Sequence, residues 1–276
     1  MITDVRLFRR GHSPGARPTS PIWCFVLAGK LAPRGSAALE RALDRARRLA
    51  PADRVVAIVS RGSTASGALR DSTADVATIV QPVYRGSAAE LFLPALLVAR
   101  RDPDAVILAL RAEEMHDGPV APCLARAVRA VRVRSELTVL VGARPRTALP
   151  FDGFVEPGLP LPDVEDLSLL AVRRFVYEVS SGRSGRDLLA PAALAARAGA
   201  LVTLGQRYVP EVLETLEPLE DVADAAEATI LSEAVYECMP YASLSREFLE
   251  RLPDLAVLPV PDALREVGDA VACLAS

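Results

Sequence analysis

The stretch Ile22–Gly35 (Ile-Trp-Cys-Phe-Val-Leu-Ala-Gly-Lys-Leu-Ala-Pro-Arg-Gly) decides how the fold is interpreted. It opens with an apolar run up to Ala28, breaks at Gly29, passes Pro33 and enters a helical pattern at Ser36. A buried strand, a glycine-containing turn and a helix in this order are typical of nucleotide sites in α/β proteins, because backbone N–H groups of the turn can face a phosphate. The alternative interpretation is a plain strand–helix connection, which every α/β protein contains several times.

Composition restricts the class of protein. The chain has 276 residues, of which 51% are hydrophobic, enough for the core of one large domain or of a domain with an appendage. A net charge of -3 argues against nucleic-acid binding. No apolar run approaches the roughly 18 residues that span a bilayer, so no membrane partner is expected. Residues 1–20 lack the apolar core of a signal peptide and predict a mobile tail, which together favour a cytoplasmic protein.

Buried-strand and amphipathic-helix patterns alternate up to Arg144. Apolar strands separated by amphipathic helices predict an α/β fold, with a mostly parallel mixed sheet and helices on both faces. Ser87 and Glu90 have the spacing of a capping box at the start of one helix. The predicted strands are Arg54–Ser60, Val76–Val80, Ala105–Leu110 and Leu137–Val141, and the predicted helices are Ser36–Leu49, Gly86–Arg101 and Val120–Val131.

Prolines cluster after Arg144, and the pattern becomes less regular. We expect a single domain over residues 21–276, divided into halves 21–144 and 145–276. In the second half the predicted strands are Phe151–Gly158 (or a hairpin), Leu169–Val179, Ala200–Leu204 and Leu255–Val260, and the predicted helices are Asp187–Arg197, Val209–Leu216, Val222–Met239 and Asp262–Leu274.

Six segments occur in an order that is found in a known family. They are Phe25–Gly29, Ile79–Pro82 followed by Arg85–Ala88, Arg101–Ala105, Phe151–Gly158, Ser243–Glu250, and Leu255–Pro261 followed by Leu264–Gly268. This collinear set resembles the sugar-1-phosphate nucleotidyltransferases, and most closely the mannose-1-phosphate guanylyltransferases. The resemblance runs from about Ile22 to the C-terminus.

The resemblance implies a Rossmann-like (GT-A-like) nucleotidyltransferase fold and a definite chemistry. In the family a sugar 1-phosphate attacks the α-phosphorus of a nucleoside triphosphate, which gives a nucleotide sugar and pyrophosphate. The implied ligands are GTP and mannose 1-phosphate, the implied cofactor is Mg²⁺ or Mn²⁺, and a homodimer is a candidate assembly. The first half would bind the nucleotide and the second half the sugar.

The family motifs also imply site residues by position. The implied nucleotide-binding residues are Leu27, Ala28, Gly29, Lys30, Gln81, Gly86 and Ser87; the catalytic residues are Arg34 and Glu113; the metal ligands are Glu113 and Glu266; and the sugar-binding residues are Glu156 and Thr203.

The chain departs from the family where the chemistry would occur. The second glycine of the family's opening loop is absent, and Lys30 is the only lysine of the chain, so the two family lysines cannot both be present. Glu178 falls where one of them is expected, and glutamates replace both metal-binding aspartates. Two hypotheses remain: a divergent transferase of weak activity, or a catalytically dead module that binds a nucleotide, a sugar phosphate or a protein partner. Because several phosphate-neutralising groups are lost together, a weak or inactive protein is favoured.

Overall fold

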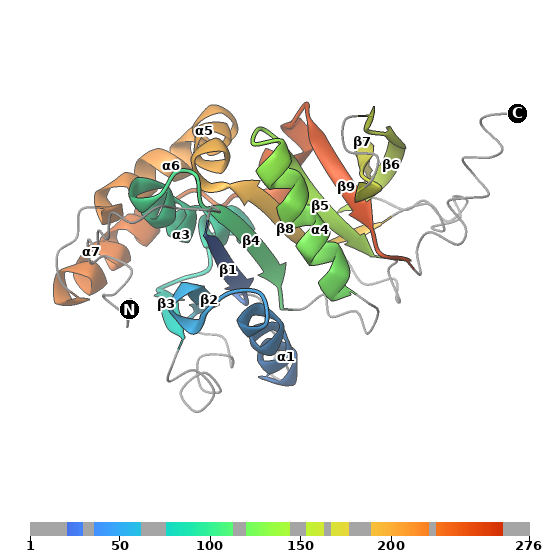
Figure 1. Cartoon of the computed structure of the whole chain (residues 1–276). Helices are drawn as coiled ribbons and strands as arrows, with labels where there is room; N and C mark the ends of the chain where they lie inside the picture. The colour runs from blue at the N-terminus through green and yellow to red at the C-terminus, as the bar shows by residue number, and fades with distance from the viewer. Residues whose placement is uncertain are drawn as a thin grey trace, which may run out of the picture.

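The computed structural model describes residues 21–29, 36–61, 76–112, 120–143, 153–162, 167–176, 189–220 and 225–261. Its centre is a nine-stranded mixed sheet of order β3-β2-β1-β4-β8-β5-β9-β7-β6 (Figure 1). The strands are β1 (Ile22–Leu27), β2 (Val55–Ser60), β3 (Ala77–Gln81), β4 (Val106–Arg111), β5 (Thr138–Ala143), β6 (Phe154–Pro160), β7 (Leu170–Val176), β8 (Ala190–Arg197) and β9 (Leu255–Pro259).

The first four strands are parallel and almost wholly buried. β1 pairs with β2 on one side and with β4 on the other, and β3 pairs with β2. All six residues of β2 are buried, as expected for a strand that is covered on both faces. The carboxyl ends of these four strands therefore lie along one edge of the sheet.

The far half of the sheet is mixed. β8 is antiparallel to both β4 and β5, β9 is parallel to β5, and β7 joins β9 to β6 in antiparallel pairs. The predicted helix over Asp187–Arg197 is wrong, because most of this segment forms β8. The sequence of β8, Ala-Pro-Ala-Ala-Leu-Ala-Ala-Arg, is rich in a helix-forming residue, but its position between two strands overrides that preference. The predicted strand Ala200–Leu204 is also wrong, because it lies within a helix.

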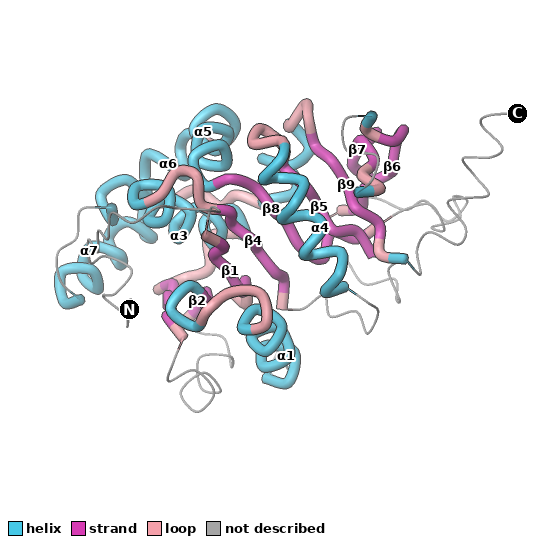
Figure 2. Tube along the Cα trace, viewed as in Figure 1, coloured by secondary structure: helices cyan, strands magenta, loops and turns pink. Residues whose placement is uncertain are grey.

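Helices cover both faces of the sheet. In Figure 1, α1 and α4 lie on one side, and α3, α5, α6 and α7 lie on the other. Figure 2 shows the same elements by type, with the strands in magenta at the centre and the helices in cyan around them. The helices are α1 (Ser36–Arg47), α3 (Ser87–Arg101), α4 (Val120–Val133), α5 (Ala198–Tyr208), α6 (Pro210–Leu216) and α7 (Ala225–Cys238), and a π-helical turn spans Leu244–Phe248.

Each face has its own hydrophobic core. Beneath α3, the ring of Phe92 meets the ring of Phe248 edge-on, with centroids 5.0 Å apart, so the late π-helical turn packs on α3. Beneath α1 and α4, Cys24 of β1 and Leu43 of α1 are fully buried. The two cores hold the parallel strands rigidly between layers, which fixes the position of their carboxyl ends.

The α/β architecture predicted from the sequence is confirmed, with strands found at all five positions expected before Arg144. Within the part of the chain that the structure describes, no helix is long and apolar enough to cross a bilayer. The expected N-terminal tail (1–20) and the expected last helix (262–274) lie outside the described residues.

Candidate functional site at the carboxyl edge of the parallel strands

Four strand ends define the candidate site. Gly29 follows β1, Ser60 ends β2, Gln81 ends β3 and Arg111 ends β4. Leu27 lies beside Arg111, and Ser60 lies beside Gln81, in the register of the sheet. In open α/β sheets, ligands bind at this carboxyl edge. The structure thus places Leu27, Ala28, Gly29 and Gln81, which the resemblance implies for nucleotide binding, at one edge.

The turn after β1 packs directly against a carboxylate. A Cβ atom built on Gly29 would lie 1.7 Å from Oε1 of Glu90 and 2.9 Å from Cδ2 of Tyr84. Only glycine fits at this position unless Glu90 moves. Glu90 is on the first turn of α3 and is only 4% exposed. A buried carboxylate therefore touches the turn that would have to approach a nucleotide.

The backbone at the end of β1 is already engaged. The Leu27 carbonyl accepts a hydrogen bond of 3.0 Å from the Ala112 N–H, and the Ala28 N–H donates to the Ile58 carbonyl at 2.8 Å. These bonds tie the glycine turn to β2 and β4 and fix its position. The Leu27 carbonyl and the Ala28 N–H thus help to hold the strands in register.

Gln81 is buried and bonded to α7. Its Nε2 donates a hydrogen bond of 2.9 Å to the Tyr236 phenol oxygen, and only 1% of Gln81 is exposed. Burial raises the pKa of the Tyr236 phenol above its usual range; the hydrogen bond from Gln81 lowers it, and the charge of Glu90 raises it further. Among the described residues, neither Oε1 of Gln81 nor Oγ of the adjacent Ser60 has a hydrogen-bond partner. Hydrogen-bonding capacity thus remains at the ends of β2 and β3.

The start of α3 is fastened to the late segment Pro240–Leu244. Gly86 has φ +93°, and a Cβ there would lie 2.0 Å from the Ala242 carbonyl oxygen. That carbonyl accepts a hydrogen bond of 3.1 Å from the Ala88 N–H, and Ser87 Oγ accepts one of 2.9 Å from the Leu244 N–H. The Ala88 N–H, a donor that could otherwise face a phosphate, is thus used within the protein, whereas the Ser87 oxygen only accepts and its O–H remains a donor.

The predicted capping box is wrong. Gly86, not Ser87, is the N-cap of α3, and no side chain caps this helix end. The Ser87 hydroxyl instead accepts from Leu244, and Glu90 reaches toward Gly29. Both side chains therefore contact distant parts of the chain and do not form a local cap.

Two arginines at this edge are bound to α7. Arg85 donates from Nε to the Tyr236 carbonyl at 2.7 Å and from Nη2 to the Glu237 carbonyl at 3.1 Å. Arg61 forms a 2.7 Å ion pair with Glu233, and both side chains are about half exposed. These cations hold α7 against the edge, which leaves less of their hydrogen-bonding capacity for a ligand.

The two predicted sugar-binding residues lie elsewhere. Glu156 is on β6, the strand farthest from β3, and pairs with Arg173 at 3.1 Å and with Arg174. Thr203 is exposed on α5, where its hydroxyl donates to the Gly199 carbonyl at 2.9 Å. Because α5 begins beside Pro103 and Ala105, at the edge where β4 starts, the structure does not bring Thr203 to the carboxyl edge.

The other predicted residues cannot be placed. Lys30, Arg34, Glu113, Glu178 and Glu266 lie outside the described residues. Within the described ranges, no group of three or more histidine, cysteine, aspartate or glutamate side chains could hold a metal ion.

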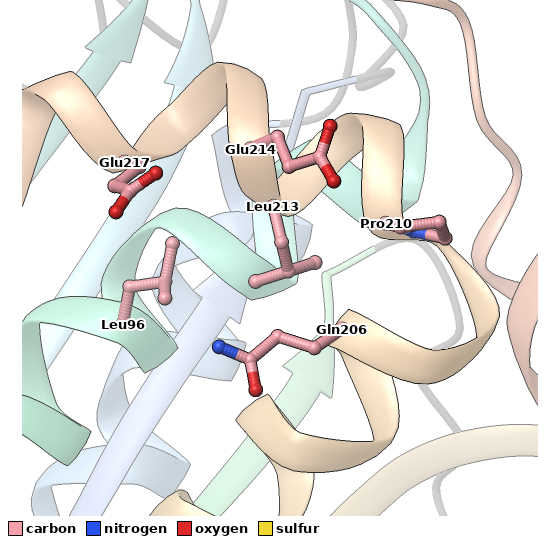
Figure 3. Close-up of a pocket in the computed structure, with 6 residues that line it drawn as sticks. All are labelled: Leu96, Gln206, Pro210, Leu213, Glu214 and Glu217. Carbon is pink, nitrogen blue, oxygen red and sulfur yellow. The ribbon is translucent and has the colours of Figure 1, made fainter.

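Two pockets open near the helices rather than between the strand ends. The one in Figure 3 has a volume of about 130 Å³. It is lined by Leu96, Gln206, Pro210, Leu213, Glu214 and Glu217. The other has a volume of about 330 Å³ and includes Tyr208, Tyr241 and Ala242. Neither is lined by a residue that the sequence predicts for the site.

Sequence reasoning missed the partners of the predicted residues. Glu90 was expected only as a helix cap, and Tyr236 had no assigned role. Ser60 could have been found, because it ends a buried strand with the same alternation that places Val56 and Ile58 under α3. Tyr236 had no such signal, since its contact with Gln81 joins residues 155 positions apart.

The fold and the glycine turn at its carboxyl edge define the class: the chain has a nucleotidyltransferase-like, Rossmann-like α/β fold. A crystal structure described as mannose-1-phosphate geranyltransferase from Thermus thermophilus superposes with a TM-score of 0.70 at 20% identity, over 87% of this chain and 74% of that one. A second, described as mannose-6-phosphate isomerase from Helicobacter pylori, has a TM-score of 0.65 at 12% identity and covers 87% and 98%. No family model matches the sequence, and no curated protein matches it.

The resemblance to the sugar-1-phosphate nucleotidyltransferases is thus confirmed in the fold. At these identities the likeness shows the fold alone.

Proposed function

We propose that this protein binds a nucleotide at the carboxyl edge of β1–β4, and that it is a divergent relative of the mannose-1-phosphate guanylyltransferases with weak or absent transferase activity. Its proposed ligands are GTP and a sugar 1-phosphate, with mannose 1-phosphate as the first candidate. The reaction to test is the formation of a nucleotide sugar and pyrophosphate.

One observation carries the nucleotide proposal. The glycine turn at Gly29, the buried amide of Gln81 and the start of α3 at Gly86 converge on one edge, although they are far apart in the sequence. Gln81 Oε1 is a buried acceptor without a protein partner among the described residues, and an N–H of a nucleobase is a suitable donor. Leu27 and Ala28 support this arrangement through the backbone bonds that fix the turn.

Weak activity is supported by the way in which phosphate-binding groups are used. The Ala88 N–H and the Arg85 guanidinium donate hydrogen bonds within the protein, whereas the Ser87 oxygen accepts one from the Leu244 N–H and keeps its O–H as a donor. Stabilisation of developing charge usually contributes more to catalysis than any other effect, and loss of a single donor costs on the order of 10²–10³ in rate. Loss of several donors would leave little turnover.

The metal and the sugar remain proposals from the family resemblance. Glu113 and Glu266 would hold Mg²⁺ or Mn²⁺, which would neutralise triphosphate charge, and Lys30 and Arg34 would add positive charge. Glu156 would contact a sugar hydroxyl, in competition with its ion pairs to Arg173 and Arg174. Thr203 is left out of the proposed site because α5 begins at the opposite edge.

Calorimetric titration of GTP, once with MgCl₂ and once with EDTA, tests the proposal. We expect measurable binding, followed by turnover of GTP and mannose 1-phosphate well below roughly 1 s⁻¹. Absence of binding in both conditions would contradict the nucleotide site and favour a module that binds a protein. Turnover at about 1 s⁻¹ or faster would contradict the weak-activity assignment.

A further inference from the structure

Two polar atoms at the candidate site are closed off from solvent and unpaired. Ser60 ends β2 and Gln81 ends β3, and the two residues lie side by side in the register of the sheet. They are only 5% and 1% exposed, and neither Ser60 Oγ nor Gln81 Oε1 has a hydrogen-bond partner among the described residues. A buried polar group without a partner is costly, so two of them next to each other need an explanation.

These atoms cannot contact a ligand in the arrangement that the structure shows. Both are inaccessible, although the carboxyl edge of an α/β sheet is where ligands bind. Side chains alternate between the faces of a sheet, so Ser60 lies on the same face as Ile58, which packs in the core beneath α3. In Figure 1, α7 lies on this side of the sheet as well. A ligand of Ser60 and Gln81 would have to enter between the strand ends and the helices of this face.

The helix α7 is fastened across both strand ends. The Tyr236 phenol oxygen accepts a hydrogen bond of 2.9 Å from Gln81 Nε2. Arg61, which directly follows Ser60, forms a 2.7 Å ion pair with Glu233. The backbone joins the two ends in addition, since the Arg61 N–H donates to the Gln81 carbonyl at 2.8 Å. α7 is therefore the element whose position controls access to this pair.

The contacts that hold α7 at this edge are largely polar. Arg85 donates to the Tyr236 and Glu237 carbonyls at 2.7 and 3.1 Å, and the side chains of Arg61 and Glu233 are both about half exposed. Bonds of this kind can be exchanged for bonds to water, and a solvent-exposed ion pair contributes little to stability. Movement of α7 away from the strand ends should therefore cost less than disruption of the core.

We propose that α7 is a movable cover of the nucleotide edge: it is closed in this structure, and a nucleotide reaches Ser60 and Gln81 only when α7 moves away from the strand ends. The inference rests on the proposed function for its ligand, whereas the movement itself needs no ligand. In the open arrangement both unpaired atoms gain access to water or to a nucleotide. The inference thus adds Ser60 to the residues that would contact the ligand.

A thiol at position 60 reports the movement. Ser60→Cys replaces one oxygen by sulfur, and N-ethylmaleimide modifies the introduced thiol only when it is accessible. Cys24 is fully buried in β1 and is the internal reference, because unfolding of the sheet exposes it. With modified sites mapped by mass spectrometry, we expect the introduced thiol to react roughly 100-fold faster than Cys24, since a local opening costs less than global unfolding.

A loosened variant connects the movement to binding. Glu233→Gln removes the ion pair with Arg61, and should raise the reactivity of the introduced thiol relative to Cys24 about two- to fivefold. With Ser60 intact, the same substitution should raise GTP affinity in calorimetry by the same factor, because apparent affinity follows the fraction of open molecules. Glu136→Gln is the matched control: it removes the ion pair with Arg134, also 2.7 Å long and distant from α7, and should change neither quantity.

Amide hydrogen exchange on the unmodified chain is a second measure of the movement, and serves if Ser60→Cys does not fold. The amides of Val235 and Tyr236 on α7 should exchange at least about tenfold faster than those of Leu93 and Leu97 on α3, which belong to the same core.

The outcomes separate this inference from the proposed function. Faster reaction of the introduced thiol than of Cys24, with parallel gains in reactivity and GTP affinity in Glu233→Gln, supports the cover. Reaction at the rate of Cys24, with α7 amides as protected as those of α3, overturns it and favours a fixed internal water between Ser60 and Gln81. Unchanged GTP affinity in a Glu233→Gln chain of raised reactivity also overturns it, while the nucleotide site stands. Rapid reaction without GTP binding in any variant overturns the nucleotide site and the role of the cover, although α7 moves.

Discussion

Gln81 at the end of β3 donates a hydrogen bond of 2.9 Å from Nε2 to the phenol oxygen of Tyr236 on α7, 155 residues later in the chain. Both side chains are buried. The bond joins a residue that the resemblance implies for nucleotide binding to a helix from the second half of the sequence. Together with the bonds from Arg85 to the Tyr236 and Glu237 carbonyls, it makes α7 part of the edge that would receive a nucleotide.

Removal of this hydroxyl should weaken the fold. We expect Tyr236→Phe to lower the free energy of unfolding by about 1–3 kcal/mol, because the buried amide of Gln81 loses its acceptor. Urea denaturation followed by circular dichroism would measure the change. Tyr241→Phe is a matched control on a ring that is 59% exposed, and should change stability by less than about 0.5 kcal/mol. Equal effects of the two substitutions would rule out a structural role for the bond.

The buried thiol of Cys24 makes stability depend on pH. Cys24 is fully buried in β1, and burial raises its pKa from 9.0 to about 12. The folded state therefore holds the proton more tightly than the unfolded state. This contribution is complete below pH 9 and is lost as pH rises toward 12, with a slope of up to about 1.4 kcal/mol per pH unit.

Comparison with Cys24→Ala isolates this contribution. At neutral pH the variant should be less stable by about 1 kcal/mol or more, because it leaves a small cavity. As pH rises from 9 to 11, we expect the stability advantage of the wild type to shrink, since only the wild type loses the linked proton. Urea midpoints at several pH values would measure it, with Cys238→Ala as a control for loss of an exposed thiol. A constant difference across this range would disprove the linkage.

The first half of the fold could be predicted because its signals are local. The apolar runs of β1, β2 and β4 are buried on both faces, and glycine or polar residues end each of them. β8 could not be predicted in the same way, because its alanines favour a helix in isolation. What makes it a strand is the pairing with β4 and β5, and no local window of the sequence contains that information.

The same limit applies to the site. The sequence predicted that Gly29 and Gln81 follow strands and that Ser87 lies at the start of a helix, and the structure places them at these element ends. The spacing of Ser87 and Glu90 predicted that both cap the same helix end. In the structure, the Ser87 hydroxyl instead accepts a hydrogen bond from the Leu244 N–H, 157 residues away, and the Glu90 carboxylate contacts Gly29. A capping-box spacing shows only that a local hydrogen-bond pattern is available, and in this protein tertiary contacts take its place.

The contact between Gly29 and Glu90 can be tested by a double-mutant cycle. Gly29→Ala alone should cost about 1–3 kcal/mol, because the new methyl group overlaps the carboxylate. In a Glu90→Ala background the same substitution should cost less, since the obstructing side chain is gone. Denaturant unfolding of the wild type, the two single variants and the double variant gives the interaction energy. Additive costs would show that the two residues do not oppose each other.

The start of α3 offers the most direct test of how the edge is assembled. Gly86 has φ +93°, and a Cβ there would lie 2.0 Å from the Ala242 carbonyl oxygen, a backbone atom that cannot rotate away. Gly86→Ala should therefore cost at least about 1–3 kcal/mol through overpacking, with backbone strain in addition. The substitution would also displace Ala242 from the Ala88 N–H.

Gly158→Ala on β6 is the matched control, because a Cβ there meets its nearest atom, the Ala171 carbonyl oxygen, only at 3.1 Å. We expect it to be the milder substitution in urea denaturation. Amide hydrogen exchange would then locate the damage: in Gly86→Ala, protection should fall at Ala88 and Leu244, whose N–H groups bond across the junction. If Gly86→Ala were as stable as Gly158→Ala and kept that protection, the late segment would not be what holds the start of α3, and the convergence of Gly29, Gln81 and Gly86 on one edge would need another cause.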